Sequence, residues 1–239
     1  MAVPHGKATR VYVAGYDLSA KLDGVSPQAE VDEHETTGFG VDSKTFIPGL
    51  TDSRLSGEGF WDTDLADDNL TDDILSANLA ADGVKVCAML SAATIGDRGY
   101  GIQAIENAYG QKSEQGGVAR VNFEARSQVG FDAIQVLHVK ATRTTDADGS
   151  ALDNSASSAN GGVGYLQVFA ATGGNAATIL IEDSPDDAVW STLVAFVAVT
   201  AVGAQRIAVT GTVDRYLRAS WTHASPPGSV QFFVAFGRE

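Results

Sequence analysis

The sequence predicts a mainly β protein with two strand-rich halves and one helix. Short runs rich in Val and aromatic residues alternate with clusters of Gly, Asn, Asp and Ser along most of the chain, as in strands joined by turns. Only one segment has helical periodicity. We expect a first domain at residues 1–138, a Gly/Ser/Asn/Asp-rich linker or long loop at 139–163, and a second antiparallel β-sandwich domain at 164–239.

Strand patterns dominate the first half. Residues 10–18 (RVYVAGYDL) alternate well enough for a strand and end in turn residues, and residues 54–61 (RLSGEGFW) alternate with one face made of small residues. Further on, VKVCAML, GYGIQAIENAYG and VARVNFEARSQ also have strand character, with glycine-rich joints between them.

One segment of the first half predicts a helix. In residues 62–83, Leu70, Ile74 and Ala77 fall at i, i+4 and i+7, and aspartates crowd the early turns, where the helix dipole favours them. Gly83 follows as a stop signal. The aspartates are expected to form a solvated face, because the helix supplies no base or nucleophile beside them.

The second half predicts a β-sandwich. Six apolar segments follow one another at spacings of about 8 to 12 residues, with no helical window between them. They are GYLQVFAAT, ATILIEDS, STLVAFVAV, QRIAVTGTV, RYLRASWT and SVQFFVAFG.

Composition limits the classes of partner. The 239 residues include 30 acids and 16 bases, a formal net charge of −14, which disfavours gripping a nucleic-acid backbone. The single cysteine, Cys87, excludes an intrachain disulfide and a four-thiolate zinc site. The start, MAVPHGKATR, lacks the apolar core of a signal peptide, and no window resembles a membrane span. We expect neither an export signal nor membrane insertion.

The stretch GFGVDSKT at residues 38–45 differs by one residue from a phosphate-binding P-loop. Such a loop follows a buried strand and opens a helix. Here the preceding AEVDEHETT is too acidic for a buried parallel strand, and Pro48 and Gly49 would break the helix that must follow. Nucleotide binding is therefore not expected.

Other polar clusters have weak chemical signals. The acids at 32–35 alternate between faces of an extended chain, and no histidine has an evident nucleophile beside it. We expect no catalytic residue, no cofactor and no metal, with calcium in the loop at 146–154 left open. Its oxygen donors would be Asp146, Asp148, Asp153 and Asn154.

Three motifs of the first half occur in a distinctive order, followed by the aspartate-rich helix. They are Gly15-Tyr16-Asp17-Leu18-Ser19, the Thr37 to Leu50 loop with Phe46-Ile47-Pro48-Gly49-Leu50, and the Leu55-to-Trp61 strand ending in Phe60-Trp61-Asp62. With these motifs, residues 8–135 resemble the tail tube (major tail) proteins of long-tailed, non-contractile bacteriophages.

This resemblance implies a β-sandwich or half-barrel flanked by a helix and a structural virion protein without catalytic residues. Such proteins form hexameric rings that stack into a hollow tail tube for DNA, with the long early loop packed against neighbouring subunits. The implied partners are copies of the same chain and other tail proteins such as the tape measure and tail terminator, with assembly in the host cytoplasm. DNA would pass without specific binding, and acidic walls would repel it. The second half looks like a β-sandwich appendage of phage virion proteins.

We predict an inter-subunit assembly loop in the region of the near-P-loop. Its apolar side chains would be exposed in a monomer, and Lys44 is a candidate for pairing with an acid of the adjacent subunit. The predicted residues are Phe39, Lys44, Phe46, Ile47, Pro48, Gly49 and Leu50.

A second class of function stays open. The C-terminal sandwich could bind a glycan or another surface through Trp190, Tyr216 or Trp221, as a virion decoration or a lectin-like protein. A lectin would remain a small oligomer, whereas a tube protein would form rings or filaments.

Overall fold

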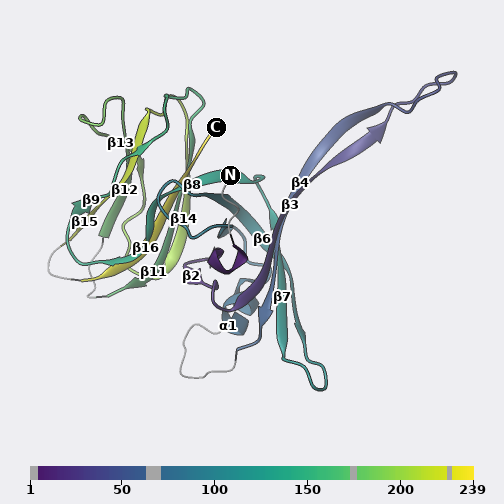
Figure 1. Ribbon diagram of the computed structural model, residues 1–239, viewed down its shortest axis with the longest axis horizontal. Helices are drawn as coiled ribbons and strands as arrows, with labels where there is room; N and C mark the ends of the chain where they lie inside the picture. The colour runs from purple at the N-terminus through teal and green to yellow at the C-terminus, as the bar shows by residue number, and fades with distance from the viewer. Residues whose placement is uncertain (1–4, 63–70, 173–176, 225–227) are drawn as a thin grey trace.

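The structure is a computed structural model that describes residues 5–62, 71–172, 177–224 and 228–239. It is mainly β, with two antiparallel sheets and, within the described residues, a single α-helix. The predicted fold class is therefore confirmed. Figure 1 shows a strand-rich body from which one long hairpin extends.

The first half contains a short 3-10 helix, eight strands and the helix α1. Their bounds are η1 Gly6–Ala8, β1 Arg10–Val13, β2 Tyr16–Asp17, β3 Leu22–Glu35, β4 Phe46–Phe60, α1 Thr71–Asn78, β5 Val84–Met89, β6 Arg98–Lys112, β7 Arg120–Ser127 and β8 Asp132–Arg143.

The second half contains eight further strands. Their bounds are β9 Ala147–Asp148, β10 Leu152–Asp153, β11 Gly162–Ala171, β12 Ala177–Ser184, β13 Ser191–Ala195, β14 Gly203–Val209, β15 Tyr216–His223 and β16 Val230–Arg238. All six segments predicted as strands of the sandwich are strands here.

The larger sheet has eleven strands and joins the two halves of the chain. Its main path runs β14-β11-β16-β8-β6-β5-β1-β2, while β7 pairs with β6 and β4, and β4 pairs with β3. Strand β8 connects the halves because it pairs with β6 on one side and with β16 on the other. It continues to Arg143, five residues beyond the boundary expected at 138.

The smaller sheet, β10-β15-β12-β13 with β9 beside β15, forms the other layer of the C-terminal sandwich. Alternate residues of β12 and β15 point inward and pack against β11 and β16 in a buried cluster that includes Ile181, Trp221 and Phe232. The expected linker at 139–163 contains the end of β8 and the short strands β9 and β10, which pair with β15. The division into two domains stays a proposal.

The N-terminal half has its own core, formed by one face of the curved sheet and α1. Strands β1, β4, β5, β6 and β7 contribute side chains to this core. Ile74 and Leu75 of α1 are buried against them. The described part of the predicted helix agrees with the prediction; residues 63–70, including Leu70, lie outside the described residues.

A third core cluster packs the two halves together. The centre of the Tyr12 ring, on β1, lies 5.0 Å from the centre of the Phe169 ring and 4.9 Å from that of the Phe233 ring. Gln167, fully buried on β11, accepts a hydrogen bond from the Gly15 backbone N–H at 2.7 Å. Gly15 has a φ of +92°, and a Cβ there would lie 2.6 Å from the Gly203 nitrogen. A side chain at this position would separate the halves.

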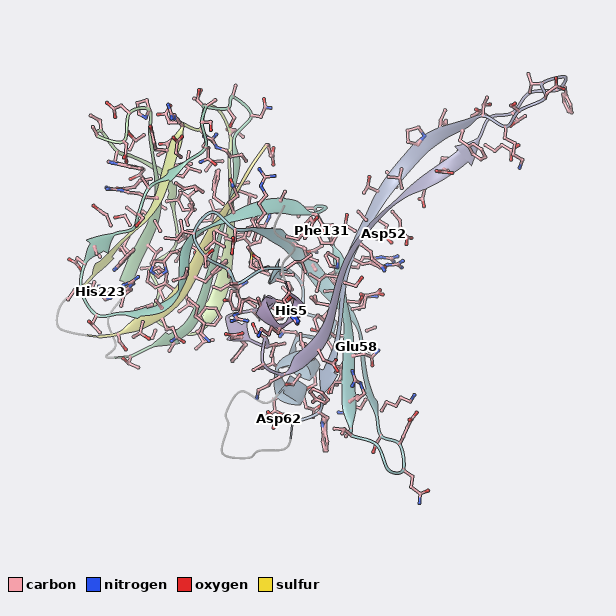
Figure 2. The ribbon with its side chains drawn as sticks, in the orientation of Figure 1. His5, Asp52, Glu58, Asp62, Phe131 and His223 are labelled. Atoms are coloured by element: carbon pink, nitrogen blue, oxygen red, sulfur yellow. The ribbon has the colours of Figure 1, made fainter. Side chains whose placement is uncertain are left out.

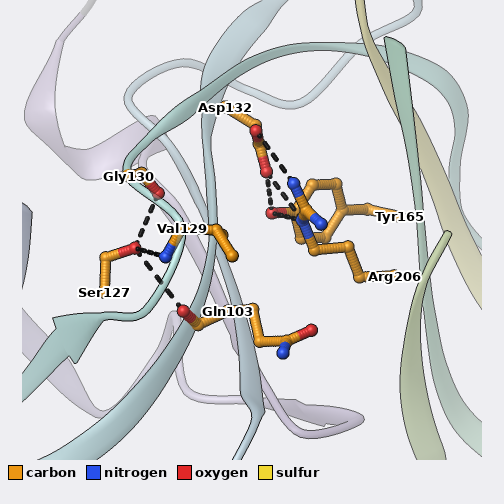
Figure 3. Close-up of polar contacts among 7 residues, drawn as sticks. All are labelled: Gln103, Ser127, Val129, Gly130, Asp132, Tyr165 and Arg206. Atoms are coloured by element: carbon orange, nitrogen blue, oxygen red, sulfur yellow. Dashed lines mark hydrogen bonds and ion pairs between the residues drawn. The ribbon is translucent and has the colours of Figure 1, made fainter. Parts of the chain in front are cut away.

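A polar network reinforces the same junction (Figure 3). Arg206 on β14 donates from Nε to Asp132 on β8 at 2.9 Å and to the Tyr165 hydroxyl at 3.0 Å. The Tyr165 hydroxyl in turn donates to Asp132. Nearby, Ser127 closes the turn into β8 by donating to the Gly130 carbonyl at 2.7 Å. The junction is therefore fixed by directional contacts as well as by apolar packing.

Candidate assembly surface

The longest projection of the molecule is the outer part of the β3–β4 hairpin, which we call the arm (residues 29–53). Figure 1 shows it leaving the body as a two-stranded ribbon, and Figure 2 shows its side chains standing free, with Asp52 near its base. Strand β7 pairs with β4 only from Arg54 to Phe60, so the arm has no third strand. Two-stranded hairpins have little stability in water without further packing.

Cross-strand ion pairs hold the base of the arm. Arg54 donates to Glu30 at 2.6 Å and to Gln28 at 3.1 Å. Arg126 of β7 reaches Asp52 at 2.6 Å, and this carboxylate raises the pKa of the Arg126 guanidinium. These contacts orient the hairpin where it leaves the sheet.

The turn of the arm is closed by hydrogen bonds among three threonines and begins no helix. The Thr36 N–H donates to the Thr45 carbonyl at 2.7 Å, and the Thr45 N–H donates to the Thr37 hydroxyl at 3.1 Å. Gly40 has a φ of +80° within this turn. The near-P-loop therefore forms the end of a hairpin, and β4 follows it where a P-loop would open a helix.

The arm exposes a set of large apolar side chains. Leu50 is 81% exposed, and the Phe39 side chain is completely exposed at the turn. The full set is Val31, Phe39, Val41, Phe46, Ile47 and Leu50. Such a concentration of apolar surface on one projection is typical of an interaction site. The structure thus places the predicted assembly residues on the arm, from Phe39 in the turn along β4 to Leu50.

The conformation of these residues differs from the expected loop. Phe46 to Leu50 lie in strand β4, paired with β3 as far as Glu35, and the turn itself covers only residues 36–45. Pro48 is tolerated because this part of β4 pairs with β3 alone, so one of its edges needs no N–H donor. The proline that argued against a helix after the near-P-loop therefore lies on a half-open strand.

Lys44 has a partner within its own arm. Its Nζ lies 2.9 Å from Glu35, and both side chains are solvent-exposed. The ammonium group lowers the pKa of the Glu35 carboxyl. The sequence suggested that Lys44 pairs with an adjacent subunit. Such pairing would require the Lys44–Glu35 contact to break, and the loss of an exposed ion pair costs little stability.

The arm is strongly acidic. It carries Glu30, Asp32, Glu33, Glu35, Asp42 and Asp52 against the single Lys44, a net charge of −5 with His34 neutral. The sequence indicated extended chain at residues 32–35, but neither the full length of β3 nor the exposed apolar residues Val31 and Val41 were predicted. Two extended segments that flank a Gly-containing turn are the pattern of a β-hairpin, and this pattern could have predicted the pairing.

The aromatic residues considered for glycan binding do not form one platform. Trp221 is 3% exposed and donates from Nε1 to the Thr145 carbonyl at 3.0 Å, so its assignment to the surface is wrong: it is a core residue. The Arg218 guanidinium lies 4.2 Å from the centre of the Trp190 ring, and Arg215 lies 4.8 Å from that of Tyr216. Guanidinium groups thus occupy positions over both of the less buried rings.

The acids of the 146–154 loop are engaged by separate basic or backbone groups. Asp146 accepts from the His223 N–H at 2.7 Å, Asp148 lies 3.1 Å from Arg218, and Asp153 lies 2.6 Å from Arg215. Arg215 lowers the pKa of the Asp153 carboxyl to about 2. Within the described ranges, no group of three or more His, Cys, Asp or Glu residues is arranged to hold a metal ion.

The described residues contain no helix long and apolar enough to cross a bilayer. No family model matches the sequence. A search of curated proteins also finds no significant relative.

Solved structures with a similar arrangement come from phage tails and related particles. The Dit protein of phage SPP1, described as a paradigm of the hub adsorption apparatus in phages that infect Gram-positive bacteria, matches 96% of this chain and 99% of its own, at 13% identity and a TM-score of 0.41. A chain of the native gene transfer agent virion matches 55% of this chain and 98% of its own, at 13% identity and a TM-score of 0.41.

A third similar structure is a chain of the phage P2 baseplate in its activated conformation. It matches 94% of this chain and 97% of its own, at 8% identity and a TM-score of 0.35. All three identities lie below 25% and all three TM-scores below 0.5, which is too low to assign a role to this chain.

Proposed function

We propose that this chain is a structural virion protein of a phage tail and that it self-assembles through the arm. The observation that carries the proposal is the set of exposed apolar side chains along a long acidic hairpin. The resemblance of residues 8–135 to tail tube proteins supports the same class. In this function the chain acts through assembly rather than catalysis.

Burial of the arm would supply the driving force for assembly. Each of Phe39, Phe46, Ile47 and Leu50 would stabilise an interface by about 1.5–3 kcal/mol when fully buried. A neighbour would also add packing to a hairpin that pairs with the body only at its base. An arm that reaches outward from each copy fits a ring, because closure allows every arm to find a neighbour.

Stacked rings, of hexameric form by the family resemblance, would form the tail tube through which DNA passes. The net charge of −14 suits such a conduit, because negative walls repel DNA and avoid the attraction that accompanies counterion release. A tube-wall protein forms rings that stack repeatedly, whereas a tail-hub protein forms only a limited number of rings. Electron microscopy of the purified chain distinguishes the two architectures.

The Phe46→Ser/Ile47→Ser double variant should fold but fail to assemble. Both side chains lie in the outer arm and contribute to none of the three buried clusters. Loss of two apolar contacts should weaken each interface on the order of 100-fold or more. Sedimentation velocity and negative-stain images measure the assembly, and circular dichroism checks the fold.

A matched Thr51→Ser/Ser53→Ala variant changes the same arm without removing a large apolar group and should assemble normally. Tubes or rings of normal length from the Phe46→Ser/Ile47→Ser protein would overturn the proposal. A wild-type chain that remains monomeric at high concentration but binds a glycan array would favour the lectin-like alternative.

A further inference from the structure

We infer that a pocket between the start of β6 and the end of β16 binds one unit of an acidic sugar, a hydroxylated group that carries a carboxylate or a phosphate. The pocket has a volume of about 330 Å³ and is lined by Arg98, Ala133, Ile134, Gln135, Asn154 and Arg238. Among the described residues, no acidic side chain lines it. We call it the rim pocket.

The larger sheet brings the residues of the rim pocket together from distant parts of the chain. Arg98 begins β6 and lies opposite Gln135 of β8, which in turn lies opposite Phe236 of β16. Side chains of directly opposite residues share one face of a sheet, and Phe236 belongs to the buried cluster between the two sheets. This row therefore runs from the core of the C-terminal sandwich outward to the exposed Arg98.

Arg98 supplies a positive charge that is not paired with an acid. Within the part of the chain that the structure describes, its guanidinium takes part in no hydrogen bond or ion pair. The preceding Asp97 is engaged elsewhere, because its carboxylate accepts from the N–H and the hydroxyl of Thr94, both at 2.9 Å. A guanidinium presents paired N–H groups that match the oxygens of a carboxylate or phosphate. Arg98 can therefore hold such a group without breaking an existing contact.

Arg238 forms a fixed part of the pocket wall. Its guanidinium donates to the Ala156 carbonyl at 2.6 Å. Burial lowers the pKa of this guanidinium, while the negative charges of Asp183 and Asp214 act in the opposite direction. These two acids offset the charge of Arg238, although neither lines the pocket. The unpaired charge is thus that of Arg98 alone, which suits a ligand with a single anionic group.

The amide side chains of the rim pocket favour a ligand that also carries hydroxyl groups. The Gln135 amide has no hydrogen-bond partner among the described residues, so it can both donate and accept. Asn154 uses its Nδ2 on the carbonyls of Leu152 and Arg215, at 3.4 and 3.3 Å. Its Oδ1 remains as an acceptor, and a carboxylate or fully ionised phosphate offers no donor to it. Sugar hydroxyls supply both donors and acceptors.

The size of the rim pocket agrees with one sugar unit. Pockets that enclose small-molecule ligands usually measure about 300–1,000 Å³. A volume of about 330 Å³ lies at the lower end of that range. It is larger than a bare phosphate ion needs and too small to enclose several linked sugars.

Isothermal titration calorimetry of the full chain tests this inference with four probes. Glucuronate and glucose 6-phosphate each combine an anionic group with sugar hydroxyls, and the tighter of the two identifies the preferred anion. Glucose lacks the charge and inorganic phosphate lacks the sugar. Each of these two should therefore bind more weakly than the acidic sugars, on the order of tenfold, because it loses part of the hydrogen bonding.

The Arg98→Gln variant should lower the affinity for the acidic sugars on the order of tenfold, since charge-assisted hydrogen bonds are lost. The exposed Arg98 side chain has no partner in the described chain, so the circular dichroism spectrum should not change. Lys7→Gln is the matched control, because it removes the same charge from another exposed position. That control should bind the acidic sugars as the wild type does.

Three results would overturn the inference. They are equal affinity of the wild-type and Arg98→Gln proteins for glucuronate and glucose 6-phosphate, inorganic phosphate that binds as tightly as glucose 6-phosphate, and no binding of any probe. None of the lining residues belongs to the arm, so the inference does not depend on the proposed function. Sedimentation of the Arg98→Gln protein should accordingly show the same assembly as the wild type.

Discussion

Replacement of Asp132 by Ala should lower the free energy of unfolding by about 3–5 kcal/mol, because it leaves the Arg206 guanidinium largely buried without its carboxylate. The Arg206 and Asp132 side chains are only 14% and 11% exposed. Tyr165 also loses the acceptor of its hydroxyl. The burial and the hydrogen bond to Asp132 raise the pKa of Tyr165, so the hydroxyl stays a donor throughout the physiological range.

Urea unfolding of the full chain measures this loss. Asp153→Ala is the matched control, because it breaks a bidentate pair with Arg215 at 2.7 and 2.6 Å whose side chains are about half exposed. That control should cost much less than Asp132→Ala, because a solvent-exposed ion pair contributes little to stability. Adding Arg206→Met to Asp132→Ala should recover part of the stability, since the unpaired charge is removed. Equal effects of Asp132→Ala and Asp153→Ala would refute a structural role for the junction network.

Glu106 should make the protein less stable as the pH rises from about 4.5 to about 8. It is 1% exposed on β6, its Oε1 has no hydrogen-bond partner among the described residues, and burial raises its pKa from 4.5 to about 8. The folded state therefore retains a proton that the unfolded chain releases. The stabilisation is complete below pH 4.5 and is lost as the pH rises through this window, by up to about 1.4 kcal/mol per pH unit.

The Glu106→Gln variant removes this titration while keeping the shape of the side chain. Its stability relative to the wild type should increase by roughly a few kcal/mol between pH 4.5 and pH 8. Urea unfolding at a series of pH values gives the difference curve. A flat curve for Glu106→Gln would mean that the Glu106 carboxyl ionises normally in the folded protein.

The periodicity of the sequence predicted most elements of this fold. Alternation in 177–184 and 215–222 identifies β12 and β15, because inward and outward residues alternate along a strand whatever its partner. The i, i+4, i+7 spacing around Ile74 likewise identifies α1. These signals are local, so the sequence carries them without reference to the rest of the chain.

The pairing partners required the tertiary structure. Strand β8 was not predicted as a strand, and the expected boundary at 138 falls inside it, although it pairs with both halves. Pairing depends on hydrogen bonds between segments far apart in the chain, and composition does not record them. For the same reason, Trp221 could be predicted as a strand residue but not as a core residue beside Phe232.

Composition and periodicity were enough to indicate a mainly β protein with one helix among the strands and an apolar segment, Phe46 to Leu50, outside the core patterns. That this segment forms one strand of an arm, far from Phe60 at the other end of the same strand, emerges only from the folded chain. Alternation sets which residues share a face, whereas register and sheet order set where each face lies.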